Sequence, residues 1–241
     1  MEFRFGGPIN IEMASIPLII LEAWVGRPAY KTVVWDWNGT IVEDAWLFVE
    51  LMNGYLKKQG LPSIDIASYR KNFCFPVIDY YRQLGFNITD KEFRDLGKQF
   101  ISDYIQGCKR PKLYKGIVDL IRCNYDSGIV QCVLSAQRQD ILRMLVAFYG
   151  LEKYFSAVIG LDNHYAYGKI DRAQDLSKKL DLDPNSTLMV GDTNHDKAVA
   201  DSLGWSCVLL STGHQSTDRL LATNASIADN PLQLKKYIYN D

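Results

Sequence analysis

The sequence lacks the features of a membrane protein, a nucleic-acid-binding protein or a disulfide-stabilised secreted domain. No apolar run approaches the roughly 18 residues that a membrane-spanning helix needs. The formal net charge is only −1, so there is no excess of lysine and arginine to bind a phosphate backbone. The five cysteines contain no Cys-x-x-Cys pair, which favours reduced, buried thiols. We therefore expect a cytoplasmic protein with neither a nucleic acid nor a membrane as its partner.

The overall composition is that of an ordinary globular protein. The chain has 241 residues, of which 47% are apolar and 23% are charged, and this length predicts one large domain or one domain with an insert. The apolar stretch at 16–21 is too short for the core of a secretory signal. We treat residues 1–29 as an N-terminal extension of unknown role, which leaves open an extra strand or arm on the core and a later start at Met13.

Short apolar runs alternate with helical patterns over most of the chain. Alternation of this kind predicts an α/β fold with a doubly wound parallel sheet. The expected strands are 32–35, 129–134, 157–159, 187–190 and 206–210, and the expected helices are 117–128, 138–149, 171–180, 196–203 and one near 232–239.

The stretch between the first and second expected strands has a different character. It holds only helical candidates, at about 48–60, 66–72, 77–84 and 90–108, and Thr89-Asp90-Lys91-Glu92 is typical of a helix start. We therefore predict a Rossmann-like core from residues 30–43 and 112–241, with residues 44–111 inserted as a helical cap. A cap at the carboxyl edge of the sheet is a natural lid.

Two acidic residues follow expected strands that lie far apart in the sequence. Asp36 comes directly after the apolar run 32–35, and Asp192 comes directly after 187–190. Ligands of open α/β sheets bind at the carboxyl ends of the strands. A carboxylate at this place can attack phosphorus if a metal ion screens its charge.

Further polar residues follow the same order. Ser135 and Ala136 come directly after the strand expected at 129–134, Lys169 stands just before the helix expected at 171–180, and Asp196 lies four residues after Asp192. Taken alone, Ser135 has the ordinary explanation of a helix N-cap, and Lys169 that of a surface lysine. Together, on strand ends in one order, they favour a common site.

This set of motifs resembles the haloacid dehalogenase superfamily of aspartate-nucleophile phosphatases. The likeness runs from about Lys31 to the C-terminus, with an insertion where the family places a helical cap, and the segment 211–214 is similar to the phosphoglycolate-phosphatase-like branch. The resemblance implies a hydrolase, namely a Mg²⁺-dependent phosphatase that acts on a small phosphorylated metabolite through an aspartyl-phosphate.

The resemblance also implies a role for each motif residue. Asp36 would be the nucleophile, and Asp36 and Asp192, with the backbone carbonyl of Asn38, would bind Mg²⁺. The phosphoryl oxygens would be held by Lys169, Ser135, Ala136 and backbone N–H groups near Gly39 and Thr40. Asp196 would orient Lys169 or a metal-bound water, while Thr40 and Thr193 would brace their loops.

One position departs from the family pattern. The family's phosphatases usually carry a second Asp two residues after the nucleophile, which protonates the leaving group, and Asn38 stands there. An amide cannot give or take a proton at neutral pH, and general acid–base help is worth ~10²–10⁴ in rate. We expect a phosphatase that favours leaving groups needing little protonation, with His195 as a candidate helper.

Two other interpretations remain open at this stage. One is a non-hydrolytic phosphate-binding or regulatory protein. The other is cleavage of a C–halogen or C–P bond, although the pair Asp192 and Asp196 argues against a metal-independent dehalogenase. A C–P hydrolase would need a reactive cap lysine, and Lys57, Lys58 and Lys71 are better explained by a solvated helix face.

The cap sequence says little about the substrate. Packing between helices explains most of its aromatic residues, which include Phe73, Phe75, Tyr80 and Tyr81. Arg82 and Lys71 are candidates for contact with a substrate carboxylate. Trp37 is either a lining residue of the pocket mouth or a packing residue of the first loop.

Overall fold

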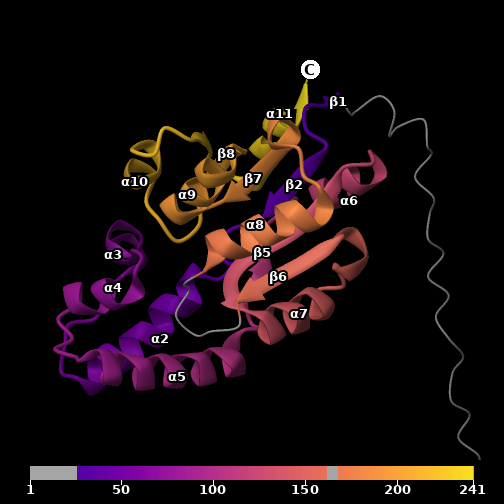
Figure 1. The fold of residues 1–241 in the computed structure, drawn as a ribbon. Coiled ribbons are helices and arrows are strands. Elements are labelled where there is room, and N and C mark those ends of the chain that lie inside the picture. Colours follow the sequence, from indigo (N-terminus) through magenta and orange to yellow (C-terminus); the bar gives the residue numbers. More distant parts are fainter. Residues whose placement is uncertain (1–25, 162–167, 241) are drawn as a thin grey trace, which may run out of the picture.

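A six-stranded parallel sheet forms the centre of the computed structural model, which describes residues 26–161 and 168–240 (Figure 1). The fold class predicted from the sequence is confirmed. Neighbouring strands pair in parallel throughout this sheet. Their order is β6 (Ala157–Leu161), β5 (Val130–Arg138), β2 (Thr32–Trp35), β7 (Thr187–Gly191), β8 (Ser206–Leu210) and β9 (Ser226–Ala228).

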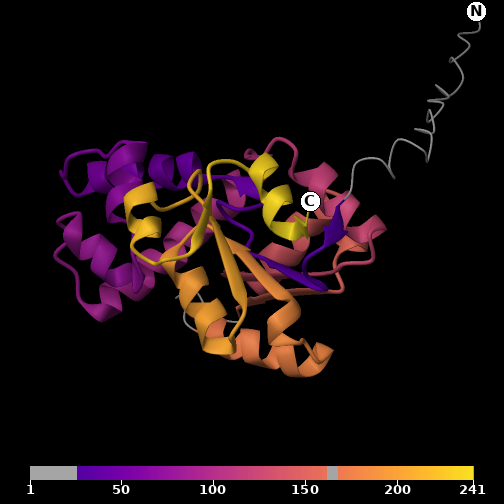
Figure 2. The same ribbon diagram turned by 90° about the horizontal axis from the view of Figure 1, so that it is seen from above.

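Helices cover both faces of the sheet. One face packs against α6 (Ile117–Asp126), α7 (Gln139–Phe148) and α11 (Lys235–Ile238), and the other against α8 (Lys169–Leu180) and α9 (Asn194–Leu203) (Figures 1 and 2). Strand β2 contributes to both cores, because Val33 and Trp35 lie in one apolar cluster and Val34 in the other. This alternation follows from the two-residue period of a strand, and burial on both faces explains its continuous apolar sequence.

The inserted segment forms a separate group of helices at one end of the sheet (Figure 1). It comprises α2 (Ala45–Lys58), α3 (Ile66–Asn72), α4 (Val77–Gln83) and α5 (Asp90–Gly107). These helices have an aromatic-rich core of their own. The start expected at Thr89 is present as a capping box with Glu92.

The two crossings between this helical group and the rest of the chain lie side by side. Strand β3 (Val42–Glu43) leads into α2, strand β4 (Lys112–Leu113) follows α5, and the two pair antiparallel. Leu47, near the start of α2, and Tyr104, near the end of α5, belong to the apolar cluster between the sheet and helices α6 and α7. The helical group is therefore tied to the sheet through its base.

Among the element boundaries that differ from the sequence prediction, three affect the candidate site. Strand β5 runs to Arg138, with a register shift between Leu134 and Arg138, where a strand ending at 134 was expected. Helix α8 begins at Lys169 itself and α9 at Asn194, each two residues earlier than expected. An apolar pattern identifies the buried turns of a helix. The first turn of a helix can be polar, so the pattern places the helix start too late.

The remaining elements lie at the edges of the molecule. Residues 1–25 of the expected N-terminal extension lie outside the described residues, and β1 (Arg27–Pro28) pairs antiparallel with β10 (Tyr239–Asn240). The helix expected near 232–239 is divided into the 3₁₀ turn η3 (Pro231–Leu234) and the short α11. The other short elements are η1 (Glu152–Tyr154), η2 (Pro184–Ser186) and α10 (Thr217–Leu221).

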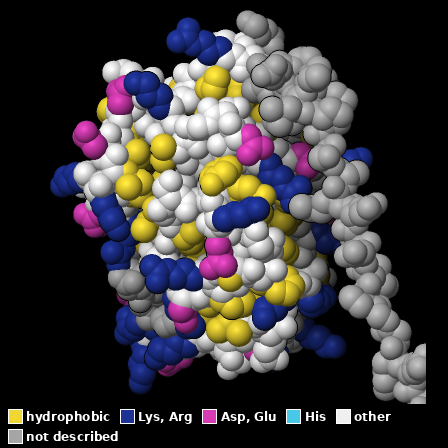
Figure 3. All heavy atoms as spheres, turned by 90° about the vertical axis from the view of Figure 1, so that its right-hand side faces the viewer, with side chains coloured by type: hydrophobic (Ala, Val, Ile, Leu, Met, Phe, Trp, Pro, Cys, Tyr) yellow, Lys and Arg dark blue, Asp and Glu magenta, His cyan; other side chains and the backbone are white. Residues whose placement is uncertain are grey.

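The surface agrees with the balanced charge of the sequence. On the side of α6, hydrophobic, basic and acidic side chains are intermingled rather than segregated (Figure 3). Among the described residues, no helix combines the length and the apolar character that crossing a membrane requires.

Candidate active site

Asp36 lies at the carboxyl end of the central strand β2, where the sheet meets the inserted helices. Its backbone N–H continues the strand ladder by donating to Val190 O over 2.8 Å. Its Oδ1 accepts from Trp37 N over 2.7 Å and lies 3.1 Å from Lys169 Nζ. Asp36 is thus fixed by a buried strand and faces a cation.

The loop after Asp36 turns sharply and brings its backbone against a second carboxylate. The carbonyl of Trp37 accepts the N–H groups of Thr40, Ile41 and Val42. Gly39 has φ +71°, and a Cβ there would lie 2.3 Å from Asp192 Oδ2. Only glycine fits this position, because any side chain would have both a disfavoured backbone conformation and a clash.

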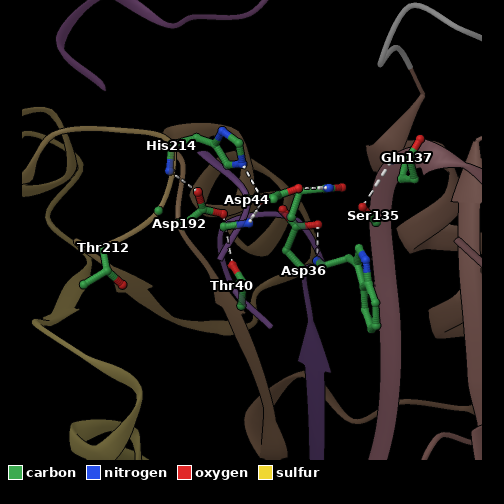
Figure 4. A network of polar contacts seen from close by, with 12 residues as sticks. Asp36, Thr40, Asp44, Ser135, Gln137, Asp192, Thr212 and His214 are labelled. Atoms are coloured by element: carbon green, nitrogen blue, oxygen red, sulfur yellow. Dashed lines mark hydrogen bonds and ion pairs between the residues drawn. The ribbon is translucent and has the colours of Figure 1, made fainter. Parts of the chain in front are cut away.

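Asp192 follows β7, the neighbour of β2, and is completely buried. Its Oδ1 accepts from Thr40 Oγ1 over 3.0 Å, and its Oδ2 accepts from His214 N over 2.6 Å (Figure 4). Thr40 was expected to brace the first loop, and the structure places its hydroxyl on Asp192. The two acidic residues that the sequence separates by more than 150 positions therefore lie at one edge of the sheet.

Lys169 and Asp196 form a buried ion pair beside these residues. Lys169 Nζ lies 2.5 Å from Asp196 Oδ1, and its side chain is 1% exposed. The other oxygen of Asp196 accepts from Asp192 N, Thr193 N and Thr193 Oγ1 at 2.7–3.1 Å. Asp196 thus contacts Lys169 through one oxygen and the loop after β7 through the other. Thr193 caps α9 by accepting from Asp196 N.

Ser135 and Ala136 lie within the irregular part of β5 rather than after the strand. Ser135 is buried, and its Oγ accepts from Gln137 N over 3.2 Å (Figure 4). The register shift at 134–138 opens the ladder with β6 at this point. Both residues line the same cavity as Asp36 and Lys169.

Burial dominates the electrostatics of the site. It raises the pKa of Asp36 to about 6 against the attraction of Lys169, and that of Asp192 to about 8. Burial alone would raise the pKa of Asp196 as well, but the Lys169 cation lowers it below its ordinary value. Desolvation would lower the pKa of Lys169, yet Asp196 and Asp36 raise it above its usual range, so the ammonium stays charged.

The comparisons with known proteins agree with this arrangement. The family model described as haloacid dehalogenase-like hydrolase matches residues 33–210. The chain belongs to this family.

Individual relatives within the family are distant. The chain is 24% identical to the probable phosphatase IndB of Dickeya dadantii over 201 residues, which are 81% of this chain and 87% of that protein. It is 25% identical to a phosphoglycolate phosphatase of Mesorhizobium japonicum, over 78% of this chain and 84% of the relative. The crystal structure of a predicted phosphatase from Clostridium acetobutylicum superposes with a TM-score of 0.74 at 22% identity, covering 87% and 98% of the two chains. The predicted resemblance to the phosphoglycolate-phosphatase-like branch is confirmed.

The donor set at this family site fits a divalent cation. Carboxylate oxygens of Asp36, Asp192 and Asp196 lie within 4.8 Å of one another, and all three residues are buried. Three carboxylates face one ammonium, so an excess of negative charge remains for a cation to offset. Asp196 already accepts four donors, whereas an oxygen of Asp36 has no protein donor among the described residues. Within the described part of the chain, Asp192 accepts only two donors, one on each oxygen, so Asp36 and Asp192 are better candidate ligands than Asp196.

Asn38 is held by a network that the sequence did not reveal. Its Nδ2 donates to Asp44 Oδ2 over 2.5 Å and to Tyr104 Oη over 2.9 Å. The other oxygen of Asp44 accepts from Gly39 N and lies 3.2 Å from His214 Nε2 (Figure 4). Although Asp44 precedes α2, its side chain does not cap that helix. An Asp before a helix is ordinarily interpreted as an N-cap, so the position of Asp44 in the sequence does not indicate its contact with Asn38.

His214 joins the network to the inserted helices. Its Nδ1 lies 2.7 Å from Tyr69 Oη of α3, and its ring packs against Phe48 of α2 at 4.8 Å. Burial lowers the pKa of His214, but the hydrogen bond to Asp44 and the negative charges of Asp44, Asp192 and Asp36 together raise it above its ordinary value. The motif at 211–214 marked this segment, but only the fold shows which residues its histidine contacts.

Several residues considered from the sequence lie away from the site. Arg82 is exposed and pairs with Asp79 and Asp90, and neither it nor Lys71 lines the cavity above Asp36.

Trp37 is buried and packs against Tyr149 at 6.0 Å, so it belongs to the core and not to the pocket mouth. Lys58 lies over the ring of Tyr55, as a solvated helix face predicts.

His195, in contrast, does line the cavity. Burial lowers its pKa, and its buried Nδ1 has no hydrogen-bond partner among the described residues. It is therefore a neutral side chain near Lys169.

Proposed function

We propose that this chain is a Mg²⁺-dependent phosphatase of small phosphate monoesters, with residues 44–111 as its lid. The observation that carries the proposal is the convergence of Asp36, Asp192 and the Lys169–Asp196 pair at the carboxyl end of β2. Curated relatives named as phosphatases support the same class of reaction. Mg²⁺ held by Asp36, Asp192 and the backbone carbonyl of Asn38 would supply the positive charge that allows an anionic ester to approach.

Each side chain has a part in the proposed reaction. A carboxylate oxygen of Asp36 attacks phosphorus, the bond to the leaving oxygen breaks, and an aspartyl-phosphate forms. Lys169 holds the phosphoryl oxygens together with Ser135 and the backbone at Ala136 and Gly39. Water then attacks phosphorus, releases phosphate and restores Asp36. The Asp196 carboxylate keeps Lys169 in place throughout.

The weak point of this reaction is protonation of the leaving group. Asn38 takes the place where the family's phosphatases carry an acid, and its amide is a donor to Asp44 and Tyr104. The proton for an alkoxide must then come from water. We therefore propose a preference for esters whose leaving groups are stable as anions.

The test compares p-nitrophenyl phosphate with phosphoglycolate, each with and without Mg²⁺. We expect Mg²⁺-dependent hydrolysis that is faster for the nitrophenyl ester, and no hydrolysis by Asp36→Asn. Retained activity in that variant would remove the nucleophile assignment. Equal, fast hydrolysis of both esters would show that Asn38 is no handicap.

A non-hydrolytic phosphate-binding protein is the second candidate, and the same observation favours it. The Asn38 side-chain nitrogen donates to Asp44 and Tyr104 and supplies no acid, so the site can hold a phosphoryl group without completing turnover. Binding of phosphate and Mg²⁺ without hydrolysis of either ester would decide for this function.

A further inference from the structure

The cavity above Asp36 has an aromatic wall formed by the inserted helices. It has a volume of about 170 Å³, and its floor is the phosphoryl site. Its upper wall draws on α2, α3, α4 and α5 and on the segment between α3 and α4. The principal wall residues are Phe48, Tyr69, Phe73, Phe75, Tyr80 and Phe100.

The rings of this wall pack against one another in fixed geometry. Phe73 is central: it stacks on Tyr69 at 5.2 Å and meets Phe75 and Tyr80 nearly edge-on at 5.3 and 5.5 Å. Phe75 continues the wall to His195, at 4.8 Å, beside the phosphoryl site. Offset and edge-to-face contacts are the favoured arrangements of aromatic rings, so a further ring can join this cluster.

Charged groups are confined to the floor of the cavity. Of the described residues that line it, the inserted helices contribute no lysine or arginine. Arg138 lines the cavity from β5, but Asp140 holds its guanidinium through two contacts of 2.5 and 2.6 Å. A carboxylate on the leaving group would therefore be buried without a free cation, which is costly.

One polar atom in the upper wall has no partner. The hydroxyl of Tyr80 is buried and makes no hydrogen bond among the described residues. Burial raises the pKa of Tyr80 above its usual range, so the group keeps its proton. Buried hydroxyls are ordinarily paired, and an unpaired one in a cavity wall is available to a ligand.

We propose that the substrate is a phosphomonoester whose leaving group carries an aromatic ring, with an acceptor atom that meets the Tyr80 hydroxyl. The inference rests on the proposed phosphatase function and adds the substrate class. An apolar cavity of ~150 Å³ is sufficient to bind benzene, and this cavity is of that size. The wall would bind the ring, while Lys169 and the phosphoryl site would bind the phosphate.

Benzyl phosphate and phosphoglycolate provide the test, because both release an alkoxide. The difference between their kcat/KM values therefore reports on binding of the leaving group in the cavity and not on the missing acid at Asn38. We expect kcat/KM for benzyl phosphate to exceed that for phosphoglycolate by about tenfold or more. An equal or higher value for phosphoglycolate would overturn the proposal.

Matched variants locate the preference in the wall. Phe73→Ala removes the central ring, and we expect it to reduce the ratio of the two kcat/KM values by about tenfold. Phe86→Ala is the control, since Phe86 is buried in the same helical core but does not line the cavity; it should leave the ratio unchanged. Tyr80→Phe should reduce kcat/KM for pyridin-4-ylmethyl phosphate more than for benzyl phosphate. A ratio insensitive to Phe73→Ala would overturn the proposal.

A binding measurement separates this inference from the proposed function. If no ester is hydrolysed, the phosphatase proposal fails, and calorimetry with benzylphosphonate and methylphosphonate in Mg²⁺ tests the cavity alone. Binding of benzylphosphonate that is about tenfold tighter would support the aromatic site. Equal affinities would overturn it.

Discussion

The side-chain amide of Asn38 donates to the buried carboxylate of Asp44 over 2.5 Å. The same carboxylate accepts from Gly39 N and contacts His214, so it ties the loop after Asp36 to the loop after β8. The amide at position 38 therefore fits its surroundings. It is matched by an acceptor that an acid at this place would repel.

Asn38→Asp should have opposite effects on turnover and on stability. A carboxyl group at position 38 faces Asp44, and two carboxylates at this distance cannot both ionise, so one proton is retained. This proton becomes available to the leaving group, and we expect hydrolysis of alkyl phosphates to rise at least severalfold, within the ~10²–10⁴ that general acid catalysis supplies. Losing the amide donation to Tyr104 and keeping one of the two carboxyl groups protonated should together lower the free energy of unfolding by about 1–3 kcal/mol. Steady-state kinetics and urea unfolding measure the two effects.

The double variant Asn38→Asp/Asp44→Asn is the control. It reverses the direction of the hydrogen bond and should recover most of the lost stability. It also removes the repulsion that holds the proton, so its alkyl-phosphate turnover should be lower than that of the single variant. No gain in turnover for Asn38→Asp would mean that another group supplies the proton.

The sequence predicted those features that depend on local pattern. The strand before Asp36 and the helix start at Thr89 were recognisable because a buried strand is continuously apolar and a capping box has a fixed spacing. Both fit the structure, in β2 and α5. The family resemblance, in turn, rested on the order of short motifs and is confirmed.

The features that were missed depend on contacts between distant segments. Asp44 and His214 lie 170 positions apart and are brought together only by the fold. Packing between helices was the explanation for the aromatic residues Phe73 and Tyr80, and they do belong to the core of the inserted helices, but the same rings also form a cavity wall. A hydrophobic pattern does not show whether the space beside a buried ring is filled.

Without metal, the protein should lose stability as pH rises from 6.5 to 8.5. Burial raises the pKa of Asp192 from its ordinary 3.8 to about 8, so the folded state binds a proton that the unfolded state has released. The pKa of His214 is also raised above 6.5, so the stability that its protonation contributes begins to be lost above that pH. For each proton that only the folded state binds, the free energy of unfolding can fall by at most ~1.4 kcal/mol per pH unit.

Mg²⁺ should reduce this loss, because it binds the deprotonated carboxylates and stabilises the folded state more at pH 8.5 than at 6.5. Urea unfolding with EDTA and with saturating Mg²⁺ measures both profiles. Asp192→Asn is the control and should flatten the metal-free profile. A stability of the unmodified protein that is independent of pH in EDTA would contradict the raised pKa of Asp192.

Gly39→Ala should be far more destabilising than Gly60→Ala, although both glycines have nearly the same φ, +71° and +68°. A Cβ at Gly60 meets nothing within 4 Å, so only the left-handed conformation costs energy, about 1–2 kcal/mol. At Gly39 the added atom would lie 2.3 Å from Asp192 Oδ2, which should add about 1–3 kcal/mol. Thermal and urea unfolding compare the two. Equal losses would show that the loop can move away from Asp192 without cost.

Arg70 connects the inserted helices to the loop that contacts Asp192, and its removal should loosen both. Its Nε and Nη2 donate to the carbonyls of Gly213 and Thr212 over 2.8 and 2.5 Å. Gly213 in turn packs so closely on Asp192 that a Cβ there would lie 2.2 Å from Oδ2. Arg70→Met should therefore increase amide hydrogen exchange in both α3 and the loop 211–216.

The same substitution should also weaken Mg²⁺ binding, because the backbone at 213–214 holds Asp192 through the His214 N–H. Calorimetric titration of Mg²⁺ measures this effect. Arg94→Met, on the exposed side of α5, is the control for loss of an arginine from the lid. If exchange rises only in α3 and Mg²⁺ affinity is unchanged, the inserted helices do not act on Asp192 through Arg70.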